Sequence, residues 1–180
     1  MVIAFIIVFV GGLGFYAVFI EPLLSPKVTR HKIVVSPDAL GQQPVRIAVL
    51  TDLHACWPWM RPKRISGIVD RVNGLEADIV ALLGDYHTAM HPPFAKPLAT
   101  ASHWAQPMER LNAPLGAFGV LGNHDWIEGG EDARDALEAH GVTILENRAA
   151  GLNTWELPYL ADRAGGSIWR GLSDSRNWAA

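Results

Sequence analysis

The chain has 180 residues, with 15 Lys and Arg against 18 Asp and Glu, and a formal net charge of −3. It therefore lacks the basic excess that drives binding to nucleic-acid phosphates, and we expect no nucleic-acid partner. Its single cysteine, Cys56, excludes an intramolecular disulfide and a Cys-x-x-Cys zinc site. The length allows one domain after an apolar N-terminal segment is subtracted, and it leaves the oligomeric state open.

The N-terminal segment, residues 2–20, contains no charged or strongly polar side chain. As a helix rising about 1.5 Å per residue, it would span roughly 29 Å, which matches the hydrocarbon core of a bilayer. It lacks the basic start and the small-residue cleavage site of a signal peptide, so residues 1–21 are predicted to form a single-pass membrane anchor. Lys27, Arg30 and Lys32 follow the anchor and favour a cytoplasmic domain, but three charges leave the side of the membrane open.

Residues 22–44 are rich in proline and are predicted to be a linker, with a short extended piece at Lys32–Ser36. From residue 45 to residue 180 the pattern alternates between apolar strands and amphipathic helices, which predicts a layered α/β domain with helices flanking the sheet. The expected strands are Val45–Leu50, Ile79–Leu83, Phe118–Leu121 and Thr143–Leu145, and the expected helices are Ile65–Val72, Leu98–Leu111 and Asp132–His140. Leu152–Leu157 and Ser167–Gly171 are also expected to be extended, so we expect the sheet to be incomplete at the C-terminus.

Polar clusters follow each of the first three predicted strands: Thr51-Asp52-Leu53-His54, Gly84-Asp85-Tyr86-His87 and Gly122-Asn123-His124-Asp125. Because the carboxyl ends of neighbouring parallel strands share one edge of a sheet, residues far apart in sequence can converge there. Asp52 and His54 alternate across one residue and so point to the same side, and a carboxylate such as that of Asp85 can bridge two cations. Mixed oxygen and imidazole ligands suit manganese, iron or zinc better than calcium.

The ordered set Asp-x-His, Gly-Asp and Gly-Asn-His-Asp resembles the first three motifs of the calcineurin-like metallophosphoesterase superfamily, over about Val45–Leu145. The apolar N-terminus and the motif spacing are most similar to its bacterial membrane-associated subfamily. The resemblance implies hydrolysis of a phosphomonoester or phosphodiester by a binuclear metal centre. The anchor favours a lipid-like or envelope substrate. The chain has neither a Gly-x-Ser-x-Gly elbow nor a Gly-x-x-x-x-Gly-Lys loop, which argues against a serine hydrolase and a P-loop enzyme.

The resemblance also implies roles for individual residues. Two divalent metal ions would be held by four ligands: Asp52 and His54 on the first metal, Asp85 bridging, and Asn123 on the second metal. The catalytic residues would be His124, facing the substrate phosphate, and Asp125, orienting the His124 ring.

The sequence departs from the family pattern after the third motif. The family continues with an isolated histidine and a Gly-His-x-His motif, whereas only His140 follows Asp125 here. His140 is expected to lie in the last turn of a helix, where imidazole is favourable, and not to bind metal. The chain is therefore expected to be either a fragment of an enzyme or a non-catalytic membrane-tethered remnant, and to bind metal weakly by itself.

Three further groups of residues have alternative interpretations. His87 and His91 follow the second motif and are expected to be solvated loop histidines outside the site. The apolar loop Trp57–Met60 fits a wall of the substrate cleft, a membrane-interface contact or core packing equally well. The basic residues of the segment Arg61–Arg64 fit either an anionic headgroup or a solvated helix start.

Overall fold

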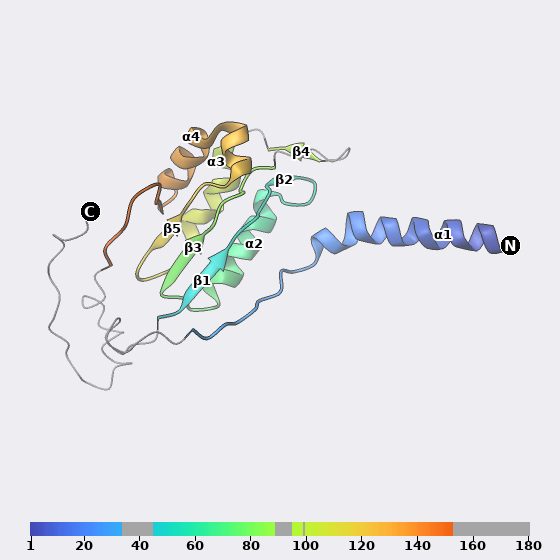
Figure 1. Cartoon of the computed structure of the whole chain (residues 1–180), viewed down its shortest axis with the longest axis horizontal. Helices are drawn as coiled ribbons and strands as arrows, with labels where there is room; N and C mark the ends of the chain where they lie inside the picture. The colour runs from blue at the N-terminus through green and yellow to red at the C-terminus, as the bar shows by residue number, and fades with distance from the viewer. Residues whose placement is uncertain (34–44, 89–94, 99, 153–180) are drawn as a thin grey trace.

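The computed structural model describes residues 1–33, 45–88, 95–98 and 100–152. The first helix, α1 (Val2–Phe15), continues through a π-helical turn, η1 (Tyr16–Ile20), and a 3₁₀ turn, η2 (Glu21–Leu23). Within the described residues, this 22-residue helical segment is long and apolar enough to cross a membrane, and none of the residues in its most apolar stretch is buried in the protein. Its N-terminal part projects away from the rest of the chain (Figure 1).

A parallel four-stranded sheet with the order β1-β3-β5-β6 forms the centre of the α/β domain. Its strands are β1 (Ile47–Leu50), β3 (Ile79–Leu82), β5 (Ala117–Gly119) and β6 (Val142–Ile144). Strands β1, β3 and β6 are short runs rich in branched side chains, which favour extended backbone. The register aligns Leu50 with Leu82, and Leu82 with Gly119, at the carboxyl ends. The three polar clusters therefore leave the sheet at one edge, and the prediction that the first three strands are adjacent and parallel is confirmed.

Helices connect the strands of the sheet: α2 (Pro62–Asn73), α3 (Ala101–Ala105) with the 3₁₀ helix η3 (Gln106–Arg110), and α4 (Asn123–Ala139). Helix α2 begins with Pro62, a favoured first helical residue, and it buries Ile65, Ile68, Val69 and Val72 along one stripe. The strand order advances across the sheet in a single direction, and right-handed crossovers then place the helices on the same face. Figure 1 shows this arrangement.

The two faces of the sheet differ strongly in exposure. On the helix-covered face Ala48, Val80, Leu82 and Ile144 are 0–7% exposed and pack in one core with side chains of α2, α3 and α4. On the opposite face, Ile47, Val49 and Leu83 are 56%, 59% and 50% exposed. The described helices thus build a core on one side of the sheet and leave the other side apolar and uncovered.

Several element boundaries differ from those predicted. The predicted helix Asp132–His140 begins nine residues earlier, at Asn123, because α4 includes a first segment that is separated by the non-helical Gly129, with φ 117°. The predicted helix over residues 98–111 is reduced to α3 and η3. A small antiparallel sheet of β2 (Cys56–Trp57) and β4 (Lys96–Pro97) was not predicted. Residues 34–44 of the expected linker lie outside the described residues. So do most residues of the three pieces that were expected to be extended, Lys32–Ser36, Leu152–Leu157 and Ser167–Gly171.

Candidate metal centre

Asp52, His54 and Asp85 converge at the carboxyl edge of the sheet. Each offers one ligand atom, and these atoms lie within 4.8 Å of one another. Asp52 is exposed, and His54 and Asp85 are half-buried, so the cluster is open to solvent. Asp52 and His54 come from the turn after β1, and Asp85 from the turn after β3, as the parallel pairing requires. The predicted convergence of these three side chains is thus observed.

The backbone of all three residues is left-handed, with φ 56° at Asp52, 44° at His54 and 55° at Asp85. Non-glycine residues rarely adopt this conformation, and each instance costs of the order of 1 kcal/mol or more. The backbone hydrogen bonds Asp52 N to Gly84 O (3.1 Å) and His54 N to Asp85 O (3.0 Å) hold the two turns together. Strain that is retained at three neighbouring polar residues is typical of a functional site.

The tautomer of His54 follows from its hydrogen bond. His54 Nδ1 lies 3.0 Å from the carbonyl oxygen of His87, which can only accept, so Nδ1 carries the proton and donates it. The other nitrogen, Nε2, then keeps its lone pair and lies 3.6 Å from Asp52 Oδ1. This is the arrangement that a metal-binding histidine requires, because the carbonyl fixes the ring and leaves Nε2 available.

Asn123 and His124 lie in the first turn of α4, beside the triad. The backbone N–H of His124 donates to Asp85 Oδ1 at 3.0 Å, and the His124 ring meets the His54 ring edge-on, with centroids 4.8 Å apart. Asn123 is exposed and precedes His124 at the start of the helix. The N-terminus of α4 therefore faces the ligand cluster, where its partial positive charge favours bound anions such as phosphate.

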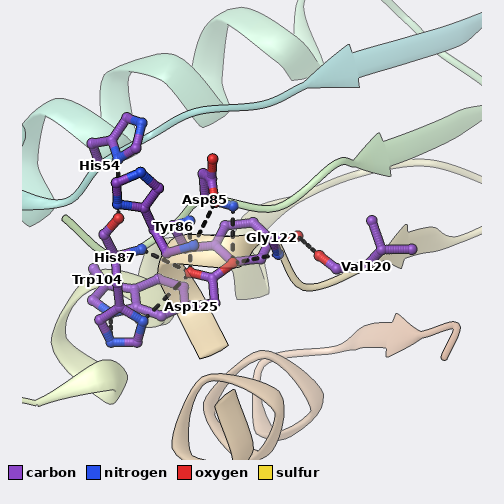
Figure 2. A network of polar contacts seen from close by, with 9 residues as sticks. His54, Asp85, Tyr86, His87, Trp104, Val120, Gly122 and Asp125 are labelled. Carbon is purple, nitrogen blue, oxygen red and sulfur yellow. Dashed lines mark hydrogen bonds and ion pairs between the residues drawn. The ribbon is translucent and has the colours of Figure 1, made fainter. Parts of the chain in front are cut away.

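Asp125 is fully buried and is surrounded by backbone donors. Its Oδ2 accepts from Asp85 N and Gly122 N, and its Oδ1 accepts from Tyr86 N and His87 N, each at 2.9 Å. Figure 2 shows this carboxylate at the centre of the network. The expected bond to the His124 ring is not among the contacts of Asp125 in the described part of the chain. Asp125 instead fixes the turn that carries Asp85.

The pKa of Asp125 reflects two opposing causes. Burial alone would raise the pKa of this carboxyl group, but the contacts with the His87 side chain and with the backbone N–H groups of His87 and Gly122 outweigh burial and lower it. The largest of these lowering contacts is with the His87 side chain, whose Nδ1 lies 3.5 Å from Asp125 Oδ1. Asp125 is thus held as a carboxylate, the form that accepts all four N–H groups.

His87 is a packing residue and not the solvated histidine that was expected. Its side chain is 17% exposed, Trp104 Nε1 donates to its Nε2 at 3.2 Å, and its ring meets the Trp104 ring edge-on at 5.0 Å. Trp104 also stacks on Tyr86, with ring centroids 5.3 Å apart. The packed side chains of Tyr86, His87 and Trp104 therefore support the turn that carries Asp85. Tyr86 and His87 belong to the second motif, which could have indicated their role, whereas no sequence pattern marks Trp104. His91 lies outside the described residues, and His140 is the C-terminal cap of α4, away from the cluster.

Glycines allow the second and third motifs to pack against each other. A Cβ atom on Gly84, whose φ is 91°, would lie 2.4 Å from Gly122 N. A Cβ on Gly122 would lie 2.2 Å from Asp85 Oδ1. Both distances are shorter than real Cβ contacts, so only glycine fits at either position. The Gly-Asp and Gly-Asn motifs are thereby joined into one unit around Asp85.

The donor set of this edge fits a divalent transition metal. Two carboxylates and an imidazole with an available Nε2 match the ligands preferred by manganese, iron and zinc, whereas calcium takes oxygen only. The sequence profile of the family described as calcineurin-like phosphoesterase matches residues 45–176, which include this whole cluster. The chain belongs to the calcineurin-like phosphoesterase family.

Relatives of this calcineurin-like phosphoesterase occur in bacteria and animals. An uncharacterized metallophosphoesterase of Helicobacter pylori is 28% identical over 138 residues, covering 77% of this chain and 34% of the relative. A second one, from Aquifex aeolicus, is 31% identical over 112 residues, covering 62% of this chain and 40% of the relative. A Danio rerio protein named transmembrane protein with metallophosphoesterase domain is 28% identical over 128 residues, covering 69% of this chain and 27% of the relative. The chain therefore spans well under half the length of each of these relatives.

Proposed function

We propose that this chain carries the N-terminal half-site of a membrane-anchored phosphoesterase that hydrolyses a phosphomonoester or phosphodiester with two divalent metal ions. The observation that carries the proposal is the convergence of Asp52, His54 and Asp85 within 4.8 Å. Phosphoester hydrolysis in general is supported by membership of the family. The binuclear centre, the substrate and the activity of the whole protein are parts of the proposal.

The four ligands would divide between two cations. Asp52 and His54 would hold the first cation, Asp85 would bridge, and Asn123 would contribute to the second. When bound, the cations would activate a water molecule and neutralise charge on the phosphoryl oxygens. His124 would face the phosphate, because its backbone is fixed on Asp85 and its ring lies against His54. Its imidazole is suited to protonating the leaving oxygen near neutral pH.

Asp125 would act by positioning and not by touching the substrate. Its carboxylate holds the N–H groups of Asp85 and Gly122, so it sets the distance between the second and third motifs. We therefore replace the role that the family resemblance implied, orientation of the His124 ring, with orientation of the Asp85 turn.

Metal binding is the direct test of the ligand set. The expected result for the 180-residue chain is weak but saturable manganese binding by titration calorimetry, and its loss in Asp85→Asn. Asp135→Asn, an exposed change on α4, is the matched control and should bind like wild type. Hydrolysis of a generic aryl phosphodiester, measured in parallel, should be slight in this chain, because only His140 follows Asp125 and the later histidine ligands of the family pattern are missing. Any manganese-dependent turnover should disappear in Asp85→Asn. Equal manganese binding by wild type and Asp85→Asn would show that the ligand set is wrong.

Membrane anchoring is tested separately. The helical segment Val2–Leu23 has the length and composition of a membrane span, and we propose that it anchors the domain. The intact chain should sediment with membranes and need detergent for release, whereas a chain without residues 2–20 should be soluble. Recovery of the intact chain in the soluble fraction without detergent would contradict the anchor. Protease protection in sealed vesicles would identify the side of the membrane.

A further inference from the structure

An open apolar groove lies between the end of the N-terminal helical segment and the candidate metal centre. Its volume is about 370 Å³, within the range of about 300–1,000 Å³ typical of small-molecule sites. The helical segment forms one wall with Val18 and Pro22. The loop after β1, which includes β2, forms the other wall with Leu53, Cys56, Trp59 and Met60. His54 also lines the groove, and the same side chain belongs to the ligand triad. An apolar site and a metal-ligand cluster thus adjoin at His54.

Specific contacts hold the two walls together across about 40 residues of sequence. The Phe19 and Trp59 rings lie 6.4 Å apart at an angle of 41°. Arg64, on α2, donates from Nη1 to Leu23 O and from Nη2 to Leu24 O, each at 2.7 Å. Figure 1 shows the C-terminal end of the helical segment approaching the loop around β2. The guanidinium thus satisfies carbonyls at the helix end and fixes where the membrane-spanning segment meets the domain.

The surroundings of the groove match the interface of a bilayer. Val18 belongs to the proposed span, which places this end of the groove at the boundary of the hydrocarbon core. Trp57, 51% exposed on the same loop, is a residue type favoured at that boundary. Arg61 and Lys63 are exposed beside it and complement the negative charge of lipid phosphate groups. One end of the groove would therefore face the hydrocarbon tails of the lipids, and the other end would face their phosphate groups.

We propose that the groove binds an acyl chain of a membrane phospholipid and so presents the phosphoester of that lipid to Asp52, His54 and Asp85. The inference rests on the proposed function and names its substrate class. An apolar wall that adjoins a cluster able to hold cations matches a molecule with a hydrocarbon tail and a phosphate head, because bound cations would offset the carboxylate charge and attract the phosphate. Hydrolysis breaks one P–O bond of the lipid and forms one between phosphorus and a water oxygen. One water proton goes to the released alcohol and the other to solvent, so water is the sole co-reactant.

The test uses the 180-residue chain in nanodiscs that contain phosphatidylglycerol with a photoreactive diazirine midway along one acyl chain. After irradiation, mass spectrometry should locate the crosslinks on the peptide that carries Leu53–Met60. Val18→Trp fills the groove from the helix side and should lower labelling of that peptide about tenfold, as expected when roughly two methylene contacts are lost. Val10→Trp, on the same helix but away from the groove, is the matched control and should label like wild type. Diacylglycerol with the same photoreactive chain lacks the phosphate and should label the peptide more weakly.

The outcomes separate this inference from the proposed function. Equal labelling of wild type and Val18→Trp, or equal labelling by diacylglycerol, would overturn the phospholipid site, and manganese-dependent turnover of the aryl ester would still stand. Groove labelling that depends on Val18 and on the phosphate would support the site even in a chain without turnover, and the proposed hydrolysis would then fail alone. Asp85→Asn should keep the acyl-chain crosslink, because the groove itself is unchanged.

Discussion

Two groups of carboxylates at one edge of the sheet differ in burial and in hydrogen bonding. Asp125 is 0% exposed and accepts four backbone N–H groups, whereas Asp52 and Asp85 lie near each other in a solvent-open cluster. The first arrangement satisfies a buried charge fully and therefore stabilises the fold. The second leaves oxygen lone pairs available and holds two like charges close together, which favours a bound cation. We call Asp125 and the N–H groups that it accepts the brace, and we call Asp52, His54 and Asp85 the ligand cluster. Mutations in the brace should mainly change stability, and mutations in the ligand cluster should mainly change metal binding.

The largest expected effect is on the brace. Asp125→Ala removes the acceptor of four N–H groups, of which the Tyr86 N–H is buried and the others are half-buried, and should lower the free energy of unfolding by about 3–5 kcal/mol. Urea denaturation in detergent measures it, and Asp132→Ala, an exposed change on the same helix, should stay within about 0.5 kcal/mol of wild type. A loss below about 1 kcal/mol for Asp125→Ala would remove the distinction between brace and ligand cluster.

Gly122 joins the two regions, and its substitution should affect both. A Cβ in Gly122→Ala would lie 2.2 Å from Asp85 Oδ1 and 2.5 Å from Asp85 N, so the Asp85 turn must move. We expect a loss of about 1–3 kcal/mol in unfolding free energy together with weaker manganese binding. The control is Gly67→Ala on α2, where nothing lies within 4 Å and helix propensity predicts a small gain. Unchanged metal binding in Gly122→Ala would show that the turn position is irrelevant to the ligands.

Asp85→Asn should change metal binding and leave stability nearly unaltered. Asparagine tolerates the left-handed backbone at φ 55° and keeps an oxygen for His124 N, so the metal-free unfolding free energy should shift by less than about 0.5 kcal/mol. Manganese should raise the melting temperature of wild type, because it binds the native state alone. That rise should be lost in Asp85→Asn, with manganese affinity lowered about 10- to 100-fold or more. A large metal-free destabilisation would instead place Asp85 in the brace.

The sequence predicted the ligand cluster better than the brace, for a physical reason. Asp52, His54 and Asp85 follow apolar strands directly, and parallel pairing of adjacent strands is enough to bring such residues together. The partners of Asp125 are backbone N–H groups, which every residue except proline carries. No pattern of side chains in the sequence therefore predicts them. The start of α4 at Asn123 was missed similarly, because Gly129 and Gly130 interrupt the apolar periodicity that marks a helix. The groove depends on contacts between residues about 40 positions apart, which local patterns do not encode.

Tyr86 offers the smallest and most local test of the brace. Its hydroxyl donates to Val120 O at 3.0 Å, linking the turn after β3 to the end of β5, and its ring stacks on Trp104. Burial raises the pKa of this hydroxyl well above its usual range, so it remains a donor at all working pH values. Tyr86→Phe keeps the ring and removes the donor, and we expect a loss of about 1 kcal/mol in unfolding free energy. Tyr16→Phe, in the helical segment, is the matched control and should change nothing. Manganese affinity should stay at the wild-type value, since the four N–H bonds to Asp125 remain. A clear drop in that affinity would mean that the Tyr86 hydroxyl, and not Asp125 alone, positions the Asp85 turn.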